Sequence, residues 1–529
     1  MKSPRNTFLA ITCFVFGFSI LGFSQAANVY ITPNGQAQGA CTTNPQSPAW
    51  FNNPANWGTG TSQIGPGTTV NLCGTIATEL TAHGSGTSSA PITISFESNA
   101  MISLPYCDNN NGCLNISGLS WIVVDGGTNG IIQNTANGSQ LANQVDSVGI
   151  MANGPSCLNC EIKNLNIINL YVHSLPGDTH NFGVTGGIFA GGVSGNAFLK
   201  IHDNVCHDVR ACLSYNPVAN DSGLQVYNNN FYNADGINIE NNGVSLVGYA
   251  IHDNQIHDIA NWDASGCPYH HDGIHSWALT GGTSSGELFY NNLISGNFGT
   301  CPTGALFFEG THSNSQIYNN VFMITYTQEN NGIVNVNGTN FQVYDNTIIG
   351  DSGVGSDICF NIGAASGRPS ITFENNILVN CNTLLLTQNS PKYTLWDYNT
   401  YGGCAATGCN SGTPIVVNGS SFDTFAAWQA ACACDSHSQY GAPTSFAGLN
   451  SSGVPQSGSP AINDGANMTS IGLAALDSDT SAGDTRTPTA RPAGACGAPG
   501  QSSCWTIGAY NYGSGGPNPP TNLSAVVGN

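Results

Sequence analysis

A short phrase that ends in asparagine recurs along the middle of the chain, at intervals of about 25 to 38 residues. Examples are IHDN, VYNN and VYDN, each with β-branched or aromatic residues before it and a second short apolar run after it. Such a pattern is typical of two β-strands joined by a tight turn. The asparagines that end the phrase are Asn204, Asn229, Asn254, Asn292, Asn320, Asn346 and Asn376. A repeat of this length predicts a solenoid, whose successive coils stack on one another.

A third apolar run lies about midway between successive phrases. It reads ACLSY from Ala211, GINIE from Gly236, GIHSW from Gly273, ALFFE from Ala305 and GIVNV from Gly332. Three short strands per coil, without helical periodicity between them, predict an all-β parallel β-helix with coils roughly 4.8 Å apart. The seven asparagines should then form an internal ladder, in which side chains hydrogen-bond from coil to coil. We therefore assign them a structural role.

Both ends of the repeat region resemble a known superfamily. The opening phrases NVYITPNG, PGTTVNLCG and SGTSSAPITISF, and the closing phrases SGSPAINDG, GDTRTP and IGAYNY, are similar to the first and last coils of pectate-lyase-like right-handed parallel β-helix proteins, in their secreted bacterial repeat form. The likeness extends from about Asn28 to Tyr512. It implies a right-handed β-helix, but it does not specify a reaction, because this superfamily includes lyases, hydrolases, epimerases and non-catalytic adhesins.

The segments outside the repeats complete the predicted organisation. Residues 1–26 combine Lys2 and Arg5 with the apolar run FLAITCFVFGFSILGF and end in SQA, which predicts a secretory signal. We assign residues 27–512 to the β-helix and about 403–512 to its C-terminal capping region. In that region, SFDTFAAWQAACA carries apolar residues at helical spacing and should form a small helical cap over one end of the solenoid. Residues 513–529 form a Gly/Pro-rich, linker-like tail.

Charge and cysteine content narrow the environment and the partners. The formal net charge is -21, with 9 Lys+Arg against 30 Asp+Glu, so a nucleic-acid partner is excluded. No later apolar run reaches the roughly 20 residues that a membrane helix needs. We expect a secreted monomer, extracellular or periplasmic.

Most of the 19 cysteines should form disulfides in an oxidising compartment. Close pairs that predict disulfides are Cys107 with Cys113, Cys157 with Cys160, Cys206 with Cys212, Cys404 with Cys409, and Cys496 with Cys504.

One stretch concentrates chemically active side chains, CPYHHDGIHSW from Cys267 to Trp277. Aligning the coils places Asp272 one coil from Asp235, and Asp235 one coil from Arg210, so these three should form a column at the edge of one sheet. The longest coil places its additional residues in the loop before Asp272, and Cys301 lies in the equivalent loop of the next coil. A Cys267–Cys301 disulfide would join the two loops above the column.

The first functional hypothesis is a glycoside hydrolase. Two stacked carboxylates cannot both ionise freely, so Asp235 and Asp272 could act as an acid/base pair, with His271 or His275 tuning them and Arg210 holding a substrate hydroxyl or carboxylate. The phrase NADGI also resembles the NTDG-type phrase of polygalacturonases, whose Asp is catalytic. That family's double-Asp and Arg-Ile-Lys phrases are absent, so the resemblance does not extend to polygalacturonase activity itself.

The second hypothesis is a polysaccharide lyase. A base removes the proton next to a uronate carboxylate, and the candidate bases are Arg210, Lys200 and His275. No cofactor is required by the first hypothesis, whereas the lyase could use Ca²⁺ held by Asp235, Asp263 and Asp272. The small number of basic residues disfavours an anionic substrate.

The third hypothesis is a non-catalytic protein that binds a glycan or adheres to a surface. The aromatic side chains of Trp262, Tyr269 and Trp277 could stack on sugar rings. Glu309 should be an outward-facing neighbour of Trp277 on the same sheet, a placement that serves sugar binding as well as hydrolysis. His270, His271 and His275 stay open between a ligand-binding role and a hydrogen-bonded loop. A polysaccharide or cell-surface glycan is the partner expected from all three hypotheses.

Overall fold

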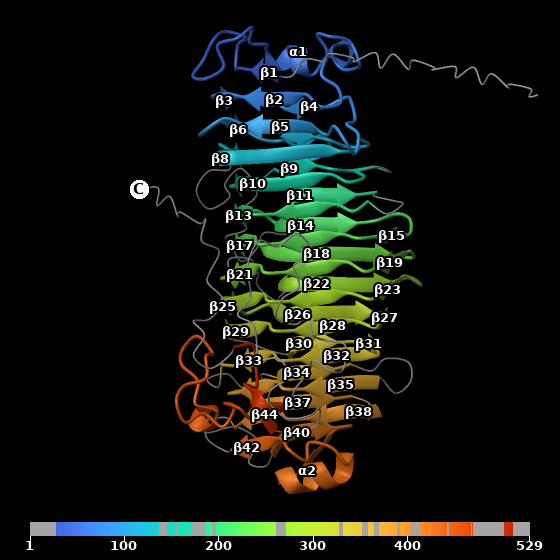
Figure 1. Cartoon of the computed structure of the whole chain (residues 1–529), viewed down its shortest axis with the longest axis vertical. Helices are drawn as coiled ribbons and strands as arrows, with labels where there is room; N and C mark the ends of the chain where they lie inside the picture. The colour runs from blue at the N-terminus through green and yellow to red at the C-terminus, as the bar shows by residue number, and fades with distance from the viewer. Residues whose placement is uncertain are drawn as a thin grey trace, which may run out of the picture.

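Strands one coil apart pair in parallel along the solenoid, in a computed structural model of the chain. Ile201 lies opposite Val226, and Val226 lies opposite Ile251 in the next coil. Figure 1 shows the strands stacked along the long axis, with α1 (Pro48–Phe51) at one end and α2 (Phe425–Cys432) at the other. The predicted parallel β-helix is therefore present.

The structure describes residues 28–136, 145–154, 157–170, 186–192, 197–260, 271–326, 332–351, 358–363, 370–388, 392–403, 413–422, 424–441, 444–466, 468 and 502–510.

The first face of the solenoid is a 13-stranded sheet. Its strands are β4 (Leu80–Thr81), β7 (Leu114–Asn115), β9 (Val148–Met151), β11 (Gly186–Gly191), β14 (Ala211–Asn216), β18 (Asp235–Asn242), β22 (His271–Leu279), β26 (Pro302–Gly310), β30 (Gly332–Val336), β34 (Ile358–Ile362), β37 (Thr383–Thr387), β40 (Thr413–Val417) and β41 (Ser420–Phe422). Only the last pair, β40 with β41, is antiparallel in this sheet.

The remaining long strands of the solenoid form a 24-stranded sheet, which bends at the asparagine turn. We call its strands before the turn the first arm and its strands after the turn the second arm. The strands before the turn are β1 (Asn28–Ile31), β2 (Thr69–Leu72), β5 (Ile92–Phe96), β12 (Lys200–His202), β16 (Gln225–Tyr227), β20 (Ala250–His252), β24 (Leu288–Tyr290), β28 (Gln316–Tyr318), β32 (Phe341–Tyr344), β35 (Ser370–Glu374) and β38 (Lys392–Asp397). The strands after it are β3 (Thr75–Ile76), β6 (Met101–Leu104), β13 (Val205–His207), β17 (Asn230–Tyr232), β21 (Gln255–His257), β25 (Leu293–Gly299), β29 (Val321–Tyr326), β33 (Thr347–Ile349), β36 (Ile377–Val379), β39 (Thr400–Gly402) and β42 (Gln439–Gly441). The longer strands β8 (Ile122–Asn134) and β10 (Glu161–Ile168) pair within both arms.

The middle coils contain a fourth strand that the sequence did not predict. It forms a five-stranded sheet of β15 (Asp221–Ser222), β19 (Ser245–Val247), β23 (Thr283–Ser285), β27 (His312–Ser313) and β31 (Gly338–Thr339). Each strand is only two or three residues long, and all except β19, which reads SLV, consist of polar residues or glycine, as turns do. Pairing with the coils above and below, rather than local propensity, makes it a strand.

The seven asparagines form one buried column. The side-chain amide of Asn204 donates to Oδ1 of Asn229 at 3.1 Å, and that of Asn254 donates to Oδ1 of Asn292 at 3.0 Å. The same pattern joins each of the remaining neighbours. The Asn254 amide also donates to the carbonyl of Val226 at 2.9 Å, so the column satisfies backbone groups inside the turn.

The residue before each ladder asparagine explains why the phrase reads DN or NN. Asp203, Asn228 and Asp253 have φ of 55°, 54° and 57°. Asn and Asp adopt this left-handed conformation more readily than other residues with a side chain, because their short polar groups can hydrogen-bond locally. The left-handed turn therefore favours Asn or Asp at the first position of the pair, and the hydrogen bonds of the ladder favour Asn at the second.

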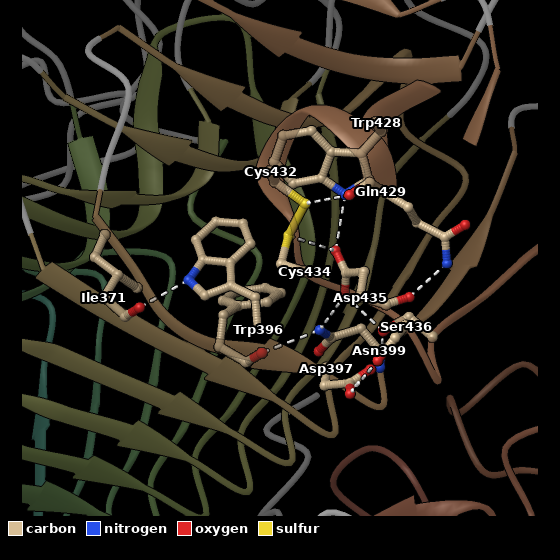
Figure 2. The surroundings of a disulfide bond; sticks show 12 residues. Ile371, Trp396, Asp397, Asn399, Trp428, Gln429, Cys432, Cys434, Asp435 and Ser436 are labelled. Atoms are coloured by element: carbon tan, nitrogen blue, oxygen red, sulfur yellow. Dashed lines mark hydrogen bonds between the residues drawn. A yellow bond between two sulfur atoms is a disulfide. The ribbon is translucent and has the colours of Figure 1, made fainter. Parts of the chain in front are cut away.

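The ladder ends at a buried aspartate beneath the helical cap (Figure 2). Asn376 donates to Asn399, and Asn399 donates to Asp435 at 3.0 Å. Asp435 also accepts from Nε1 of Trp428 on α2 at 2.8 Å. The predicted helical segment is therefore present, and a carboxylate takes the place of the next asparagine.

The C-terminal capping region also covers one outer column of rings. His202, Tyr227, His252, Tyr290 and Tyr318 stack with neighbouring centroids 4.5 to 5.0 Å apart. Ala466, Met468 and Trp505 pack against the later tyrosines of this column. Ala466 belongs to β43 (Gly465–Ala466), which pairs antiparallel with β44 (Ser502–Trp505). Two short 3-10 helices, η1 (Pro54–Asn56) and η4 (Thr444–Ala447), complete the described secondary structure.

The cysteine predictions had mixed outcomes. Disulfides join Cys107 to Cys113 and Cys206 to Cys212 as predicted, and further disulfides join Cys41 to Cys73, Cys359 to Cys381, and Cys432 to Cys434. The predicted Cys157–Cys160 disulfide is wrong, because both are buried free thiols. The Cys160 thiol faces the Leu119 carbonyl at 3.8 Å, and its hydrogen bond with Cys157, together with burial, raises the pKa of Cys157 well above its usual value. The pairs Cys404–Cys409 and Cys496–Cys504 involve residues outside the described ones.

Replacing Asn254 by Leu should destabilise the protein by about 1–3 kcal/mol, because the turn carbonyls and the amides of the ladder lose their partners. Urea unfolding followed by circular dichroism measures this change. Asn242→Leu, at an exposed position on β18, is the control and should change the free energy of unfolding little. Equal stability of Asn254→Leu and the wild type would contradict the role of the ladder.

Glu374 should make stability depend on pH. Burial and the nearby Asp345 and Asp397 carboxylates raise its pKa from 4.5 to about 8. The folded state therefore binds this proton more tightly than the unfolded state, so its stabilising contribution is complete below about pH 4.5 and is lost as the pH rises through about 8. The free energy of unfolding of the wild type, measured by urea titration, should fall across this interval relative to Glu374→Gln, by about 1.4 kcal/mol for each pKa unit of the shift. Parallel pH profiles of the two proteins would show that Glu374 does not titrate in this way.

Candidate functional site

Three adjacent strands of the 13-stranded sheet present polar and aromatic side chains away from the core. On β18, β22 and β26 most inward positions are apolar, as with Ile237, Ile274 and Leu306, which belong to the hydrophobic core. The alternate positions point outward. We call these outward side chains the candidate face: Asn238, Glu240, His275, Trp277, Phe307 and Glu309. It has two rows, Asn238–His275–Phe307 and Glu240–Trp277–Glu309, in which the members lie opposite one another in successive strands.

Asp235 and Asp272 lie side by side at the edge of this face. The backbone N–H of Asp272 donates to Oδ1 of Asp235 at 3.0 Å. Oδ2 of Asp235 accepts from the Asn238 amide at 2.7 Å and lies 3.3 Å from Arg210 Nη1. Both oxygens of Asp235 therefore contact donors of the protein itself.

Arg210 is not in the column where the alignment of coils placed it. Ala211, not Arg210, lies opposite Asp235, so the register prediction was wrong by one residue. The guanidinium still reaches Asp235, because a long side chain spans that offset.

Asp272 belongs to a second chain of contacts. Its Oδ1 accepts from the Thr303 hydroxyl, and its Oδ2 lies 3.3 Å from Nδ1 of His275. Nε2 of the same imidazole lies 3.4 Å from Oε2 of Glu309. Asp272 is only 1% exposed, whereas the Glu309 side chain is 42% exposed, so the imidazole connects a buried carboxylate to an accessible one.

Glu240, on the candidate face, has a clearly perturbed pKa. Burial raises its pKa above the ordinary value; Arg210 opposes this shift and Asp235 adds to it. Asn216 donates to Oε2 of Glu240 at 3.3 Å. A protonated carboxyl group at Glu240 can donate a proton to a bound molecule, which an ionised neighbour cannot do.

Aromatic rings surround His275 on the candidate face. The centroid of its imidazole lies 4.7 Å from that of Phe307 and 4.4 Å from that of Trp277. Trp277 lies directly opposite Glu309 on the same sheet, as predicted, and opposite Glu240 on its other side. An indole between two carboxyl groups is suited to a sugar ring, which presents both apolar C–H groups and hydroxyls.

The structure places the other predicted residues as follows. Nε2 of His271 lies 2.8 Å from the carbonyl oxygen of Phe298 on β25, so this nitrogen contacts the backbone of the 24-stranded sheet. Lys200 lies on β12 of the 24-stranded sheet and does not belong to the candidate face. Cys301 is disulfide-bonded. Trp262, Asp263, Cys267, Tyr269 and His270 lie outside the described residues, so their roles and the Cys267–Cys301 pairing stay predictions.

Sequence reasoning missed Glu240 and Thr303. Glu240 ends the phrase GINIE, and the same alignment that paired Trp277 with Glu309 also pairs it with Trp277. The alignment of the coils therefore predicts this pairing, whereas the Asp-Gly dipeptides mark only the start of each strand. Thr303 precedes the ALFFE run, and nothing in the sequence links it to Asp272.

No metal site or membrane-spanning helix is found among the described residues. No group of three or more His, Cys, Asp or Glu side chains there is arranged to hold a metal ion. Within the same ranges, no helix has the length and apolar character needed to cross a membrane.

Comparison with known proteins yields structural similarity alone. No protein-family model and no curated protein matches the chain. Its structure is similar to a GH136 lacto-N-biosidase from Eubacterium ramulus, with 10% identity over 78% of this chain and 68% of that chain and a TM-score of 0.44. It is also similar to pectate lyase Pel9A, with 13% identity over 93% and 97% of the two chains and a TM-score of 0.35. The fold is established here by strand pairing, and function is argued from the residues of this chain.

The pKa of Glu240 should respond to its neighbours in opposite directions. Arg210→Gln removes a cation and should raise this pKa further, whereas Asp235→Asn removes an anion and should lower it. Infrared difference spectra between each protein and its Glu240→Gln counterpart, recorded across pH, isolate the carboxyl band. An unchanged midpoint in both variants would contradict the electrostatic coupling across this edge.

Proposed function

We propose that this chain is a secreted carbohydrate-active protein that hydrolyses glycosidic bonds at the candidate face. The observation that carries the proposal is the row Glu240–Trp277–Glu309, in which a carboxyl group with a raised pKa and an accessible carboxylate flank an indole ring. Glycoside hydrolysis needs these two carboxyl groups, one to protonate the leaving oxygen and one to act as base or nucleophile.

Glu240 is the general acid in this proposal, and Glu309 is the base. They lie two coils apart, so their Cα atoms are roughly 9.6 Å from one another. The proposal therefore places the two carboxyl groups somewhat closer together than the Cα atoms, at about 6.5–9.5 Å, which leaves room for a water molecule and gives inversion at the anomeric carbon. The predicted product therefore has the opposite anomeric configuration to the substrate.

Asp235 and Asp272 take positioning roles. The sequence suggested them as the working pair, but both Asp235 oxygens accept from protein donors, and Asp272 is buried against Thr303 and His275. Asp272 orients His275, and His275 in turn lies beside the Glu309 carboxylate. This arrangement holds the Glu309 side chain in position to activate water.

The pairing of Arg210 with Asp235 beside the candidate face favours hydrolysis over β-elimination. A lyase must neutralise a uronate carboxylate, but Arg210 is paired with Asp235 and the face carries Glu240 and Glu309. An anionic polymer would approach like charges. The preferred substrate is thus a neutral extracellular polysaccharide, and a polysaccharide lyase or a non-catalytic glycan-binding protein remains an outcome of the test.

Incubation with a panel of neutral and uronate polysaccharides should release reducing ends without an ultraviolet-absorbing unsaturated end. Glu240→Gln and Glu309→Gln should each lower turnover about 10²–10⁴-fold while binding is retained, because each removes one proton-transfer step. Glu97→Gln, in a distant N-terminal coil, is the control and should keep full activity. Unsaturated products would establish a lyase. Binding without turnover would establish a non-catalytic protein. Full activity of Glu240→Gln would show that the reaction takes place at a different site.

A further inference from the structure

A group of polar side chains interrupts the apolar core directly behind the candidate face. One inward column lies where each coil enters the strand that precedes the asparagine turn. It is occupied by Leu199 and Leu224 in two coils and by Phe341, the first residue of β32, in a later coil. In the three coils between them the same position is Tyr249, Glu287 and Ser315, all buried. These coils also contain β22 and β26.

A second inward column shows the same interruption. On the 13-stranded sheet, Ser276 lies between Ile239 and Phe308 of the neighbouring strands, and both neighbours belong to the hydrophobic core. Ser276 is fully buried, and it separates His275 from Trp277 in the sequence. The inward polar group and the two outward groups of the candidate face therefore share one short stretch of backbone.

These side chains form one continuous hydrogen-bonded chain through the core. The Ser276 and Tyr249 hydroxyls lie 2.6 Å apart, and the Tyr249 hydroxyl donates to Oε1 of Glu287. The Ser315 hydroxyl donates to Oε2 of Glu287, and Nδ1 of His312 lies 2.8 Å from Oε1. We call Tyr249, Ser276, Glu287, His312 and Ser315 the internal network.

The internal network ends on the backbone of the candidate face. Nε2 of His312 lies 3.0 Å from the carbonyl oxygen of Glu309. A carbonyl oxygen only accepts, so Nε2 carries a hydrogen. A second hydrogen lies between Nδ1 and the Glu287 carboxyl group, and whichever of the two holds it, the His312–Glu287 pair has no net charge. Both side chains are fully buried, so this neutrality avoids an uncompensated charge in the core.

The solenoid itself does not require this network. Leucine and phenylalanine fill the same column in neighbouring coils, and burying an ion pair in place of apolar side chains gives little or no gain in stability. What the network adds is directional contact, because hydrogen bonds fix Ser276 and the Glu309 carbonyl relative to one another. Apolar packing alone would let the two strands adjust.

We propose that Tyr249, Glu287 and His312 are positioning residues of the candidate face, holding β22 and β26 from inside the solenoid so that Trp277 and Glu309 keep their relative placement. The proposal rests on the proposed function for its effect on turnover. The effect on the two strands is independent of any substrate.

The test compares two buried Tyr→Phe changes. Tyr249→Phe removes a hydroxyl of the internal network, and Tyr401→Phe removes one that lies 3.2 Å from the buried Asp435 carboxylate in the cap. Each variant loses one hydroxyl that contacts a buried carboxylate, so general destabilisation is matched. Tyr249→Phe should speed amide hydrogen exchange in β22 and β26 at least threefold and leave β34 unchanged, whereas Tyr401→Phe should leave β22 and β26 unchanged.

The kinetic arm uses the polysaccharide that gives the most reducing ends in the panel. Tyr249→Phe should lower kcat at least fivefold with KM nearly constant, and Tyr401→Phe should alter neither. His312→Gln, which keeps an N–H donor for the Glu309 carbonyl, should retain more activity than His312→Leu. Equal exchange and equal kcat for Tyr249→Phe and Tyr401→Phe would overturn the proposal. If no polysaccharide is cleaved, the proposed function fails, and the exchange data alone decide whether the network holds the strands.

Discussion

Coil-to-coil hydrogen bonding through a single column of asparagines fixes the register of this solenoid. Each ladder asparagine bonds to the next one and to the backbone of a neighbouring coil. A slip of one residue would therefore break the column and turn every outward side chain inward. The register in turn means that any side chain placed on one strand has a defined neighbour one coil above and one coil below.

That constraint explains how a chain with few charges can bring polar and aromatic side chains together on one face. The row Glu240–Trp277–Glu309 is assembled from three strands by stacking. The same rule operates inside the molecule, where Tyr249, Glu287 and Ser315 occupy one column, and at the cap, where Asp435 continues the asparagine ladder. In these three places, stacking from coil to coil brings the polar side chains together.

The sequence could predict the features that repeat. The asparagine phrase carries a turn preference and a ladder preference at once, so it located the coils and the stacking of Asp235 beside Asp272. The phrase could not place Arg210, because the spacing of the repeats does not show whether the bend before a strand is one residue longer in one coil than in the next. Strands such as β23 and β27 escaped prediction because tertiary pairing, not composition, makes them strands.

The side chains of the proposed site were harder to predict because their chemistry depends on burial. Glu240 looks like an ordinary strand residue until its desolvation is known, and Asp235 looks reactive until its donors are known. Cys157 and Cys160 have disulfide spacing, yet both are free thiols.

The central claim is that a glycan binds across β18, β22 and β26. A crystal structure of the Glu240→Gln variant with an oligosaccharide prepared from the best substrate tests it most directly. The account predicts a sugar ring against Trp277 with its glycosidic oxygen beside position 240 and a water molecule at Glu309. Sugar bound on another face of the solenoid, with the candidate face empty, would contradict it.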